Sequence, residues 1–359
     1  MHSSSLFPIL VIGQPLLDIS ARVNAKLLKR YGLNANDMVL ATPEHQTLYK
    51  ELQENGSNVT YLAGGSCQNS ARGAQWLLPA NSTCYIGVVG KDDAAKKLRE
   101  AANADGLRVE FVEDRTLPTG KCAVLITGQD RSMVTDLQAS ATISAGTLEN
   151  EGVWQLVQNS RIIYTVGFML KGSSDAVLKV ARHATETGKV FAFNLSAPFI
   201  PEVFKAELAE VIPHSSFLFG NESEARAYAR SVNLKTNSIR DIALHLAKLS
   251  KADSSLPNRT VVITQGPDPV IVATPSGVRE FVVPHVAARF IVDSNGAGDG
   301  FCGGFLAALT LEKSLRICVR SGLFVAGEVL KQEGATYPKG PCVRPWDDWS
   351  FQGGCCALQ

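Results

Sequence analysis

One acidic residue, Asp299, lies at a predicted helix start that would otherwise bind an anion, so its negative charge suggests a chemical role. Asp299 belongs to the stretch DSNGAGDGF, residues 293–301, in which Gly296 and Gly298 predict a tight turn and the residues from Phe301 onward predict a helix. Free amides and the helix macrodipole make such a helix start a site for anions such as phosphate. A carboxylate there repels phosphate, but it suits a general base aimed at a hydroxyl. The stretch therefore favours phosphoryl transfer to a hydroxyl.

Two other interpretations of this stretch stay open at this point. A glycine-rich helix start can simply allow close packing against a neighbour. Gly298, Gly300 and Gly303 also match the G-x-G-x-x-G letters of dinucleotide sites, but they come late in the chain, and no acidic residue closes a second strand about 20 residues on. A P-loop is excluded, because G-x-x-x-x-G-K-[ST] does not occur.

A second glycine-led helix start lies in YLAGGSCQNSARGAQWLL, residues 61–78. Gly64 and Gly65 precede Ser66, which we interpret as an N-cap, and Asn69 falls on the first turn of the predicted helix. Backbone amides with an amide side chain suit hydroxyl groups better than a full charge. This stretch is a weaker candidate for a ligand site than the first.

The elements that would position these residues alternate regularly along the chain. From residue 154 onward, predicted strands and helices follow one another, and the strands are RIIYTVGF, KVFAFNL, SFLFGN, TVVITQG and FIVD, with a hairpin before the last one. This alternation predicts a mostly parallel, doubly wound α/β sheet. The strands end in polar or glycine residues such as Asn194, Asn221, Thr264 and Asp293, so we expect ligands at the carboxyl edge of the sheet.

Several residues near predicted strand ends allow two interpretations each. Asp18, just after the first strand Ile9–Gly13, is either a ligand of the site or a turn aspartate. Asn221 and Glu224 either hold a hydrated magnesium ion or cap the next helix. Phe168 and Phe199 are either core residues or walls against a flat ligand.

A segment of different character interrupts the first half of the chain. Residues 109–137 contain three short strand-like runs with turns and no helix between them, which predicts an antiparallel insert that pairs with ISARV and MVLAT and covers a cleft. Arg131 lies at the turn end of the last run, either as a solvated side chain or as a clamp for phosphate.

Composition narrows the classes of partner. The chain has 359 residues, 45% of them hydrophobic, and a formal net charge of +1, so we expect small-molecule ligands, no nucleic acid and a monomer. There is no apolar run of about 18 residues, and the N-terminal stretch lacks the pattern of a signal peptide, so we expect a cytoplasmic protein without stable membrane insertion. Eight scattered cysteines without a C-x-x-C pair predict reduced thiols, and the six dispersed histidines argue against zinc.

The motifs GGSCQNSARGAQW and DSNGAGDGF resemble the two signatures of the ribokinase-like (PfkB) carbohydrate kinase family. Together with GQPLLDIS and NLSAPFI, they are similar to the adenosine-phosphorylating members of that family, over about residues 9–345. The resemblance implies a three-layer α/β/α sandwich with a small β-sheet lid. It also implies transfer of the γ-phosphoryl group of ATP to the 5′-hydroxyl of adenosine, with Mg²⁺, and it leaves open activation by a monovalent cation.

The resemblance also implies domain bounds. The large nucleotide-binding domain would comprise residues 1–16, 43–108 and 138–346, the lid residues 17–42 and 109–137, and the tail residues 347–359. The tail ends Cys356-Ala-Leu-Gln, which fits the C-a-a-X prenylation pattern, with Cys355 as a second lipidation candidate.

By resemblance, each site residue has an implied role. Asp299 would be the base, the amides of Gly296, Ala297 and Gly298 would hold the transferring phosphoryl group, and Arg131 would reach it from the lid. The implied adenosine site consists of Gln14, Leu16, Asp18, Gly64, Gly65, Asn69, Met133, Leu137, Phe168 and Phe199. The implied ATP site consists of Asn221, Glu224, Thr264, Gly266 and Asn295, with Asn221 and Glu224 also linked to magnesium through water.

Two alternatives accompany this hypothesis. Another nucleoside kinase or a sugar kinase of the same family would share Asp299, but a bare sugar needs no aromatic walls such as Phe168 and Phe199. A nucleoside-binding regulatory relative would be expected to have lost part of the catalytic set, whereas Asp299, Arg131 and the glycines are all present.

Overall fold

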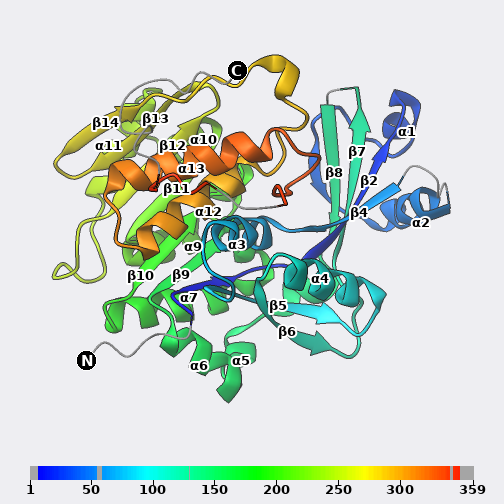
Figure 1. The fold of residues 1–359 in the computed structure, drawn as a ribbon, viewed down its shortest axis with the longest axis horizontal. Coiled ribbons are helices and arrows are strands. Elements are labelled where there is room, and N and C mark those ends of the chain that lie inside the picture. Colours follow the sequence, from blue (N-terminus) through cyan, green and yellow to red (C-terminus); the bar gives the residue numbers. More distant parts are fainter. Residues whose placement is uncertain (1–6, 55–58, 129, 340–342, 348–359) are drawn as a thin grey trace.

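The computed structural model describes residues 7–54, 59–128, 130–339 and 343–347. These residues form a nine-stranded sheet with helices on both faces and a separate five-stranded sheet, which stands to one side at the right of Figure 1. The predicted class, a mostly parallel α/β/α sandwich with a small second sheet, is confirmed. No helix of the described segments combines the length and the apolar composition needed to cross a membrane.

The large sheet contains every parallel strand that the alternating pattern predicts except FIVD. Runs such as Ile9–Ile12 and Ile162–Val166 are buried along their whole length, as expected for strands covered on both faces. In spatial order the strands are β14 (Gly277–Phe281), β13 (Asp268–Thr274), β12 (Thr260–Gln265), β11 (Phe217–Asn221), β10 (Val190–Asn194), β9 (Ile162–Val166), β1 (Ile9–Ile12), β5 (Thr83–Gly90) and β6 (Arg108–Asp114). The strands from β12 to β6 run parallel, and the hairpin β13–β14 is antiparallel.

Helices cover the two faces of this sheet. One group, in which α12 packs against both α3 and α13, lies in front of the sheet in Figure 1. It consists of α3 (Ser66–Leu77), α4 (Asp93–Ala104), α12 (Ala297–Thr310) and α13 (Leu315–Val329). The second group comprises α5 (Ala145–Leu148), α6 (Glu151–Asn159), α7 (Leu170–Glu186), α8 (Phe199–Val203), α9 (Lys205–Val211), α10 (Glu222–Ser231) and α11 (Ile239–Lys248). Short 3-10 turns occur at Pro43–His45, Gln138–Thr142, Gly167–Met169, Ile212–His214 and Ala288–Phe290.

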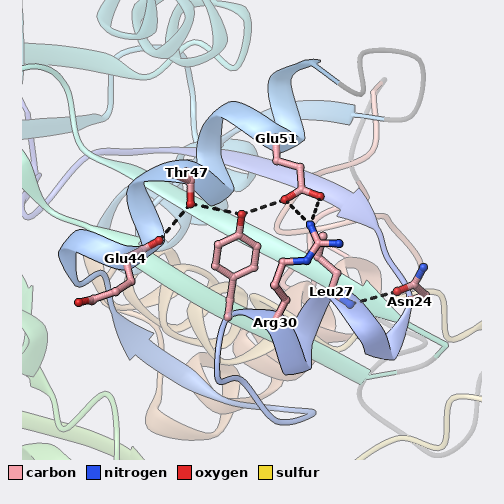
Figure 2. Close-up of polar contacts among 7 residues, drawn as sticks. Asn24, Leu27, Arg30, Glu44, Thr47 and Glu51 are labelled. Atoms are coloured by element: carbon pink, nitrogen blue, oxygen red, sulfur yellow. Dashed lines mark hydrogen bonds and ion pairs between the residues drawn. The ribbon is translucent and has the colours of Figure 1, made fainter.

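The small sheet and its two helices form a unit with its own core, which we call the lid. Its strand order is β3 (Met38–Leu40), β8 (Asp130–Asp136), β7 (Lys121–Thr127), β2 (Leu16–Arg22) and β4 (Val59–Gly64). Helices α1 (Ala25–Arg30) and α2 (Gln46–Glu54) supply apolar residues to that core. Figure 2 shows how they are joined: Glu51 accepts hydrogen bonds from Arg30 at 2.9 and 3.1 Å and from Tyr31 at 2.8 Å. The helices therefore hold together as one layer on the sheet.

Strand β6 belongs to another sheet than predicted, and β4 lies in the lid although the predicted bounds place its residues in the large domain. Strand β6 is not part of the insert, because it pairs in parallel with β5 after the crossover helix α4 and so extends the large sheet. Strand β4 lies in the small sheet, where it pairs antiparallel with β2. The predicted pairing of the insert with ISARV and MVLAT is found, but β7 lies parallel to β2 and β8 lies parallel to β3. The domain bounds stay a proposal, and the observed packing favours moving α2 and β4 into the lid and β6 out of it.

The prediction that FIVD, residues 290–293, forms a strand is wrong. Phe290, Ile291 and Val292 are 49%, 44% and 58% exposed and form no strand. The place beside β12, where a further parallel strand would pair, is occupied by β13 of the hairpin β13–β14. Its amides bond elsewhere: those of Val292 and Asp293 donate to the Leu330 carbonyl at the end of α13, at 2.8 and 3.2 Å.

Candidate active site

The glycine turn of DSNGAGDGF leads directly into α12. Gly296 is the N-cap, with φ +78°, a left-handed conformation that favours glycine. Helix α12 begins at Ala297, four residues before the predicted start, so Asp299 lies in its first turn. The Gly300 amide donates to Gly296 O at 2.8 Å, and the Ala297 amide makes a longer bond of 3.4 Å to Ser294 O. The turn thus offers first-turn helix amides beside one carboxylate.

The carboxylate of Asp299 is held by the first turn of α3. Ser66 Oγ donates to Asp299 Oδ1 at 2.6 Å, and Asn69 Nδ2 donates to Asp299 Oδ2 at 3.0 Å. Burial raises the pKa of Asp299 to about 6, while these two hydrogen bonds limit the rise. A carboxylate with this pKa is ionised at neutral pH and still basic enough to accept a proton.

Close packing of α3 and α12 sets this geometry. A Cβ at Gly303 of α12 would lie 2.5 Å from the Ser70 carbonyl oxygen and 2.8 Å from the Ala74 nitrogen of α3, so the two backbones touch there. The packing interpretation of the glycine-rich helix is therefore correct for Gly303, and the interpretation as an anion site concerns a different part of the same helix.

A second carboxylate, Asp18 on β2, enters the same cavity from the lid. Burial raises the pKa of Asp18 to about 7, with a further rise from the charge of Asp299 and a lowering by Arg72. Within the described residues, no group donates a hydrogen bond to Asp18. A Cβ on Gly64 would lie 2.1 Å from Asp18 Oδ1, so this glycine leaves room for the carboxylate.

Most predicted site residues line one cavity of about 300 Å³ between the lid and the carboxyl edge of the large sheet. The lid side of its wall is apolar except for Asp18 and Thr135, and Phe168 and Phe199 of the large domain lie next to each other with ring centroids 6.2 Å apart. The predicted residues in the wall are Gln14, Leu16, Asp18, Gly65, Asn69, Met133, Leu137, Phe168, Phe199, Asn221, Glu224, Thr264, Asn295, Gly296, Gly298 and Asp299.

Four predicted residues, Gly64, Ala297, Gly266 and Arg131, are outside that wall. Gly64 and Ala297 adjoin wall residues in the chain, and Gly266 occupies the turn between β12 and β13, with φ +56°. Arg131 pairs with Asp293, the first residue of the DSNGAGD stretch, at 2.5 Å, and both side chains are largely buried. A lid arginine therefore reaches the segment that leads into α12.

Asn221 and Glu224 cap α10, as one of the two interpretations expected. Asn221 Nδ2 donates to Glu224 Oε1 at 2.8 Å, and its own Oδ1 accepts from the Glu224 amide at 2.9 Å. Glu224 also faces the cavity, and burial raises its pKa to about 7. In the described part of the chain, no group of three or more His, Cys, Asp or Glu side chains is arranged to hold a metal ion directly.

Sequence reasoning missed three contributors. Ser66 was interpreted as an N-cap, but the N-cap of α3 is Gly65, and Ser66 is the first helical residue. Buried Arg72 pairs with Asp105 at 2.5 Å and favours the charge of Asp18. Lys171 lines the cavity at a kink in α7, and its carbonyl accepts from Gln14 Nε2 at 3.4 Å. The only sequence signal for Ser66 and Arg72 was their place in the second glycine motif.

The cysteines of the described residues are free thiols, as predicted. Cys67, Cys84, Cys122, Cys302 and Cys318 are free and buried. Residues 348–359, with Cys355 and Cys356, lie outside the described residues, so the C-a-a-X prediction is untested.

Comparison with known proteins gives concordant matches. The pattern of the pfkB family carbohydrate kinases matches residues 26–340. The chain is 40% identical over 344 residues to adenosine kinase 2 of Arabidopsis thaliana, covering 95% of this chain and 99% of that protein. It is also 40% identical to the adenosine kinase of Schizosaccharomyces pombe, over 91% of this chain and 95% of the relative.

Solved structures match equally well. The crystal structure of Anopheles gambiae adenosine kinase in complex with P1,P4-di(adenosine-5) tetraphosphate has a TM-score of 0.87 and 40% identity, and the match covers 93% of this chain and 99% of that one. Adenosine kinase from Schistosoma mansoni in complex with adenosine and AMP has a TM-score of 0.85 and 32% identity, over 92% and 98% of the two chains.

Proposed function

The chain belongs to the pfkB family of carbohydrate kinases, and from this premise we propose that it transfers the γ-phosphoryl group of ATP to the 5′-hydroxyl of adenosine, giving AMP and ADP. The observation that carries the proposal is the carboxylate of Asp299, held by two hydrogen bonds at the N-terminus of α12, in a cavity with an apolar half. Relatives about 40% identical over nearly the whole chain bear the name adenosine kinase, which supports the choice of acceptor.

The apolar half of the cavity suits a purine base. Leu16, Met133 and Leu137 come from the lid and Phe168 and Phe199 from the large domain, so a flat ring would be enclosed between them. The ribose would lie near Gln14, Gly65, Asp18 and Asn69. Asn69 Oδ1 is buried and makes no hydrogen bond within the described residues, and it is therefore available as an acceptor for a sugar hydroxyl.

The polar half suits phosphoryl transfer. Asp299 takes the proton of the 5′-hydroxyl while the 5′-oxygen attacks the γ-phosphorus. The bond between the γ-phosphorus and the β–γ bridging oxygen breaks, and ADP leaves. The α12 amides stabilise the charge on the transferring group. Arg131 exchanges its contact with Asp293 for a contact with the phosphate, and enclosure by the lid keeps water out.

Asn221 and Glu224 fit a magnesium ion held through water. Oxygen donors of this kind bind hydrated Mg²⁺, and Glu224 faces the cavity with lone pairs in addition to those that accept from Asn221. The ion would neutralise charge on the phosphate oxygens of ATP. Thr264, Gly266 and Asn295 complete the proposed ATP site.

We also retain the expectations that the protein acts as a monomer in the cytoplasm, on small molecules alone. Sedimentation of the purified protein and fractionation of cells test them. A dimer, or a protein recovered with the membrane fraction, contradicts the corresponding expectation.

The assay that tests the function is ADP release from MgATP with adenosine, inosine, guanosine, ribose or fructose as acceptor. We expect turnover on adenosine and much slower turnover on the sugars, which leave the apolar half of the cavity unfilled. Turnover on a sugar alone would contradict the proposed acceptor. Binding of adenosine without any turnover would instead indicate a regulatory relative.

A further inference from the structure

We propose that Ser66 is a positioning residue of the catalytic base: its hydroxyl fixes the direction of the Asp299 carboxylate. The inference rests on the proposed function, since it concerns the same base. It assigns a task to a side chain that the sequence pattern alone presented as a helix cap.

The hydroxyl of Ser66 is not used to cap its own helix. Gly65 occupies the N-cap position of α3, with φ +93°, and Ser66 follows as the first helical residue. Its Oγ donates instead to Asp299 Oδ1, a residue 233 positions later in the chain, at 2.6 Å. At this distance the bond is of the short, charge-assisted kind.

Two bonds from one helix turn reach the two oxygens of one carboxylate. Ser66 holds Oδ1 and Asn69 holds Oδ2, so rotation of the carboxyl group about its Cβ–Cγ bond is blocked. A single bond would hold only one of the two oxygens. Each oxygen keeps a further lone pair, so the carboxylate can still accept a proton from the substrate hydroxyl.

The turn that carries Ser66 is itself fixed. The Asn69 carbonyl accepts from the Tyr337 hydroxyl at 2.7 Å, and the Arg72 guanidinium lies over the Tyr337 ring, 5.6 Å from its centre. Arg72 also donates to the carbonyls of Ala63 and Ala335, at 3.2 and 3.0 Å. The helix turn that carries Ser66 is therefore rigid, as the positioning of a catalytic group requires.

The protonation of Asp299 depends on several neighbours besides Ser66. The hydrogen bonds from Ser66 and Asn69 lower its pKa, against burial. The titratable groups that sense its charge come from three helices, two strands and the C-terminal segment: Asp18, Cys67, Tyr164, Glu224, Cys302 and Tyr337, with cationic Arg72 acting on Asp18. Removing the Ser66 hydroxyl leaves all of these in place, so a change in titration can be assigned to Ser66.

The test compares Ser66→Ala with Ser66→Thr, which keeps a hydroxyl, in the full-length protein. Ser231→Ala is the matched control, because Ser231 is also half-buried on a helix, but its hydroxyl donates to the Tyr228 carbonyl away from the cavity. Two readouts are needed: kcat and KM for adenosine across pH, and the titration of the Asp299 carboxyl by ¹³C NMR, assigned with Asp299→Asn.

For Ser66→Ala we expect kcat near pH 7 to fall about 10- to 100-fold, as for a misplaced catalytic group, with the KM for adenosine within about threefold. The pKa of Asp299 should rise by about one pH unit, in both readouts, because a donor to the charged form is lost. Ser66→Thr should recover most of the activity, and Ser231→Ala should match the wild type.

Two results would overturn the inference. One is an unchanged Asp299 titration in Ser66→Ala; the other is a raised KM with unchanged kcat, which would make Ser66 a substrate contact. If the wild type does not phosphorylate adenosine, the proposed function fails, but the NMR titration still decides whether Ser66 holds Asp299.

Discussion

Asp299 and Asp18 face the same cavity from opposite sides and differ in how they are held. Both have a raised pKa, with burial as the largest cause. Asp299 lies in the first turn of α12 with both oxygens bonded to α3, whereas Asp18 lies on a lid strand and receives no hydrogen bond from the described residues. The anchored carboxylate is suited to proton transfer, where direction matters. The unbonded one is suited to a ligand that brings its own hydroxyl donors.

This contrast explains why two acids can share one site. A buried carboxylate without donors is unfavourable until a ligand supplies them, which gives Asp18 a reason to favour a ribose over a ligand without hydroxyls. Asp299 has its donors already, so binding of the ligand need not reorganise it.

The largest effect should come from Asp299→Asn. The amide cannot accept the proton, so we expect kcat to fall by about 100- to 10,000-fold. The variant is nearly isosteric and keeps an oxygen for one of the two α3 donors. Steady-state ADP release measures the loss, and a loss below tenfold would remove Asp299 from the role of base.

Asp18→Asn should act mainly on affinity. We expect kcat/KM for adenosine to fall about 10- to 100-fold, since hydrogen bonds to a charged acceptor are lost, with a smaller change in kcat. Its preference for adenosine over 2′- and 3′-deoxyadenosine should shrink as well. A preference equal to that of the wild type would show that the ribose hydroxyls do not meet Asp18.

The pH dependence of kcat/KM sharpens the contrast further. Because the base acts ionised and the pKa of Asp299 is about 6, activity should fall about tenfold for each pH unit below 6. Initial rates between pH 5 and 8 at saturating MgATP give the profile. A limb set by Asp18 would lie near pH 7 instead and would be abolished in Asp18→Asn.

The smallest effect concerns stability. The pKa of Asp18 is higher in the folded protein than in the unfolded chain, so the folded state binds the proton more tightly and loses stability as pH rises from about 4 to about 7. Asp18→Asn removes this loss. We expect its Tm at pH 8 to exceed that of the wild type by a few degrees, with a smaller difference at pH 5. If the Tm difference between Asp18→Asn and the wild type were equal at pH 5 and pH 8, the stabilisation would not come from titration of Asp18.

The sequence predicts the framework well because parallel strands leave a clear local pattern. Buried runs such as Ile162–Val166, each followed by a helix, identified the large sheet and its carboxyl edge. FIVD carries the same apolar letters but forms no strand: β13 occupies the place beside β12, and the Val292 and Asp293 amides bond to the end of α13 instead. The prediction assigned β6 to the wrong sheet, because its local sequence pattern would fit either sheet. Only its pairing with β5 determines which sheet it joins.

In the site, too, local motifs identify single residues but not the contacts between distant segments. The glycine motifs identified Asp299 and Asn69 as separate candidates, but the bonds from Ser66 and Asn69 to Asp299 join residues 233 and 230 positions apart. These bonds depend on the backbone contact between α3 and α12 at Gly303. No local pattern encodes such a contact. Residue spacing alone likewise could not predict the ion pair of Arg131 with Asp293, which joins the lid to the segment before α12.

The most direct test of the contrast between the two carboxylates is calorimetric titration of adenosine into Asp299→Asn and Asp18→Asn, side by side with the wild type. We predict that Asp299→Asn binds adenosine within about threefold of the wild-type Kd, and that Asp18→Asn binds it about tenfold or more weakly. Loss of binding in Asp299→Asn, with wild-type affinity in Asp18→Asn, would contradict the assignment of Asp299 as base and Asp18 as ribose ligand.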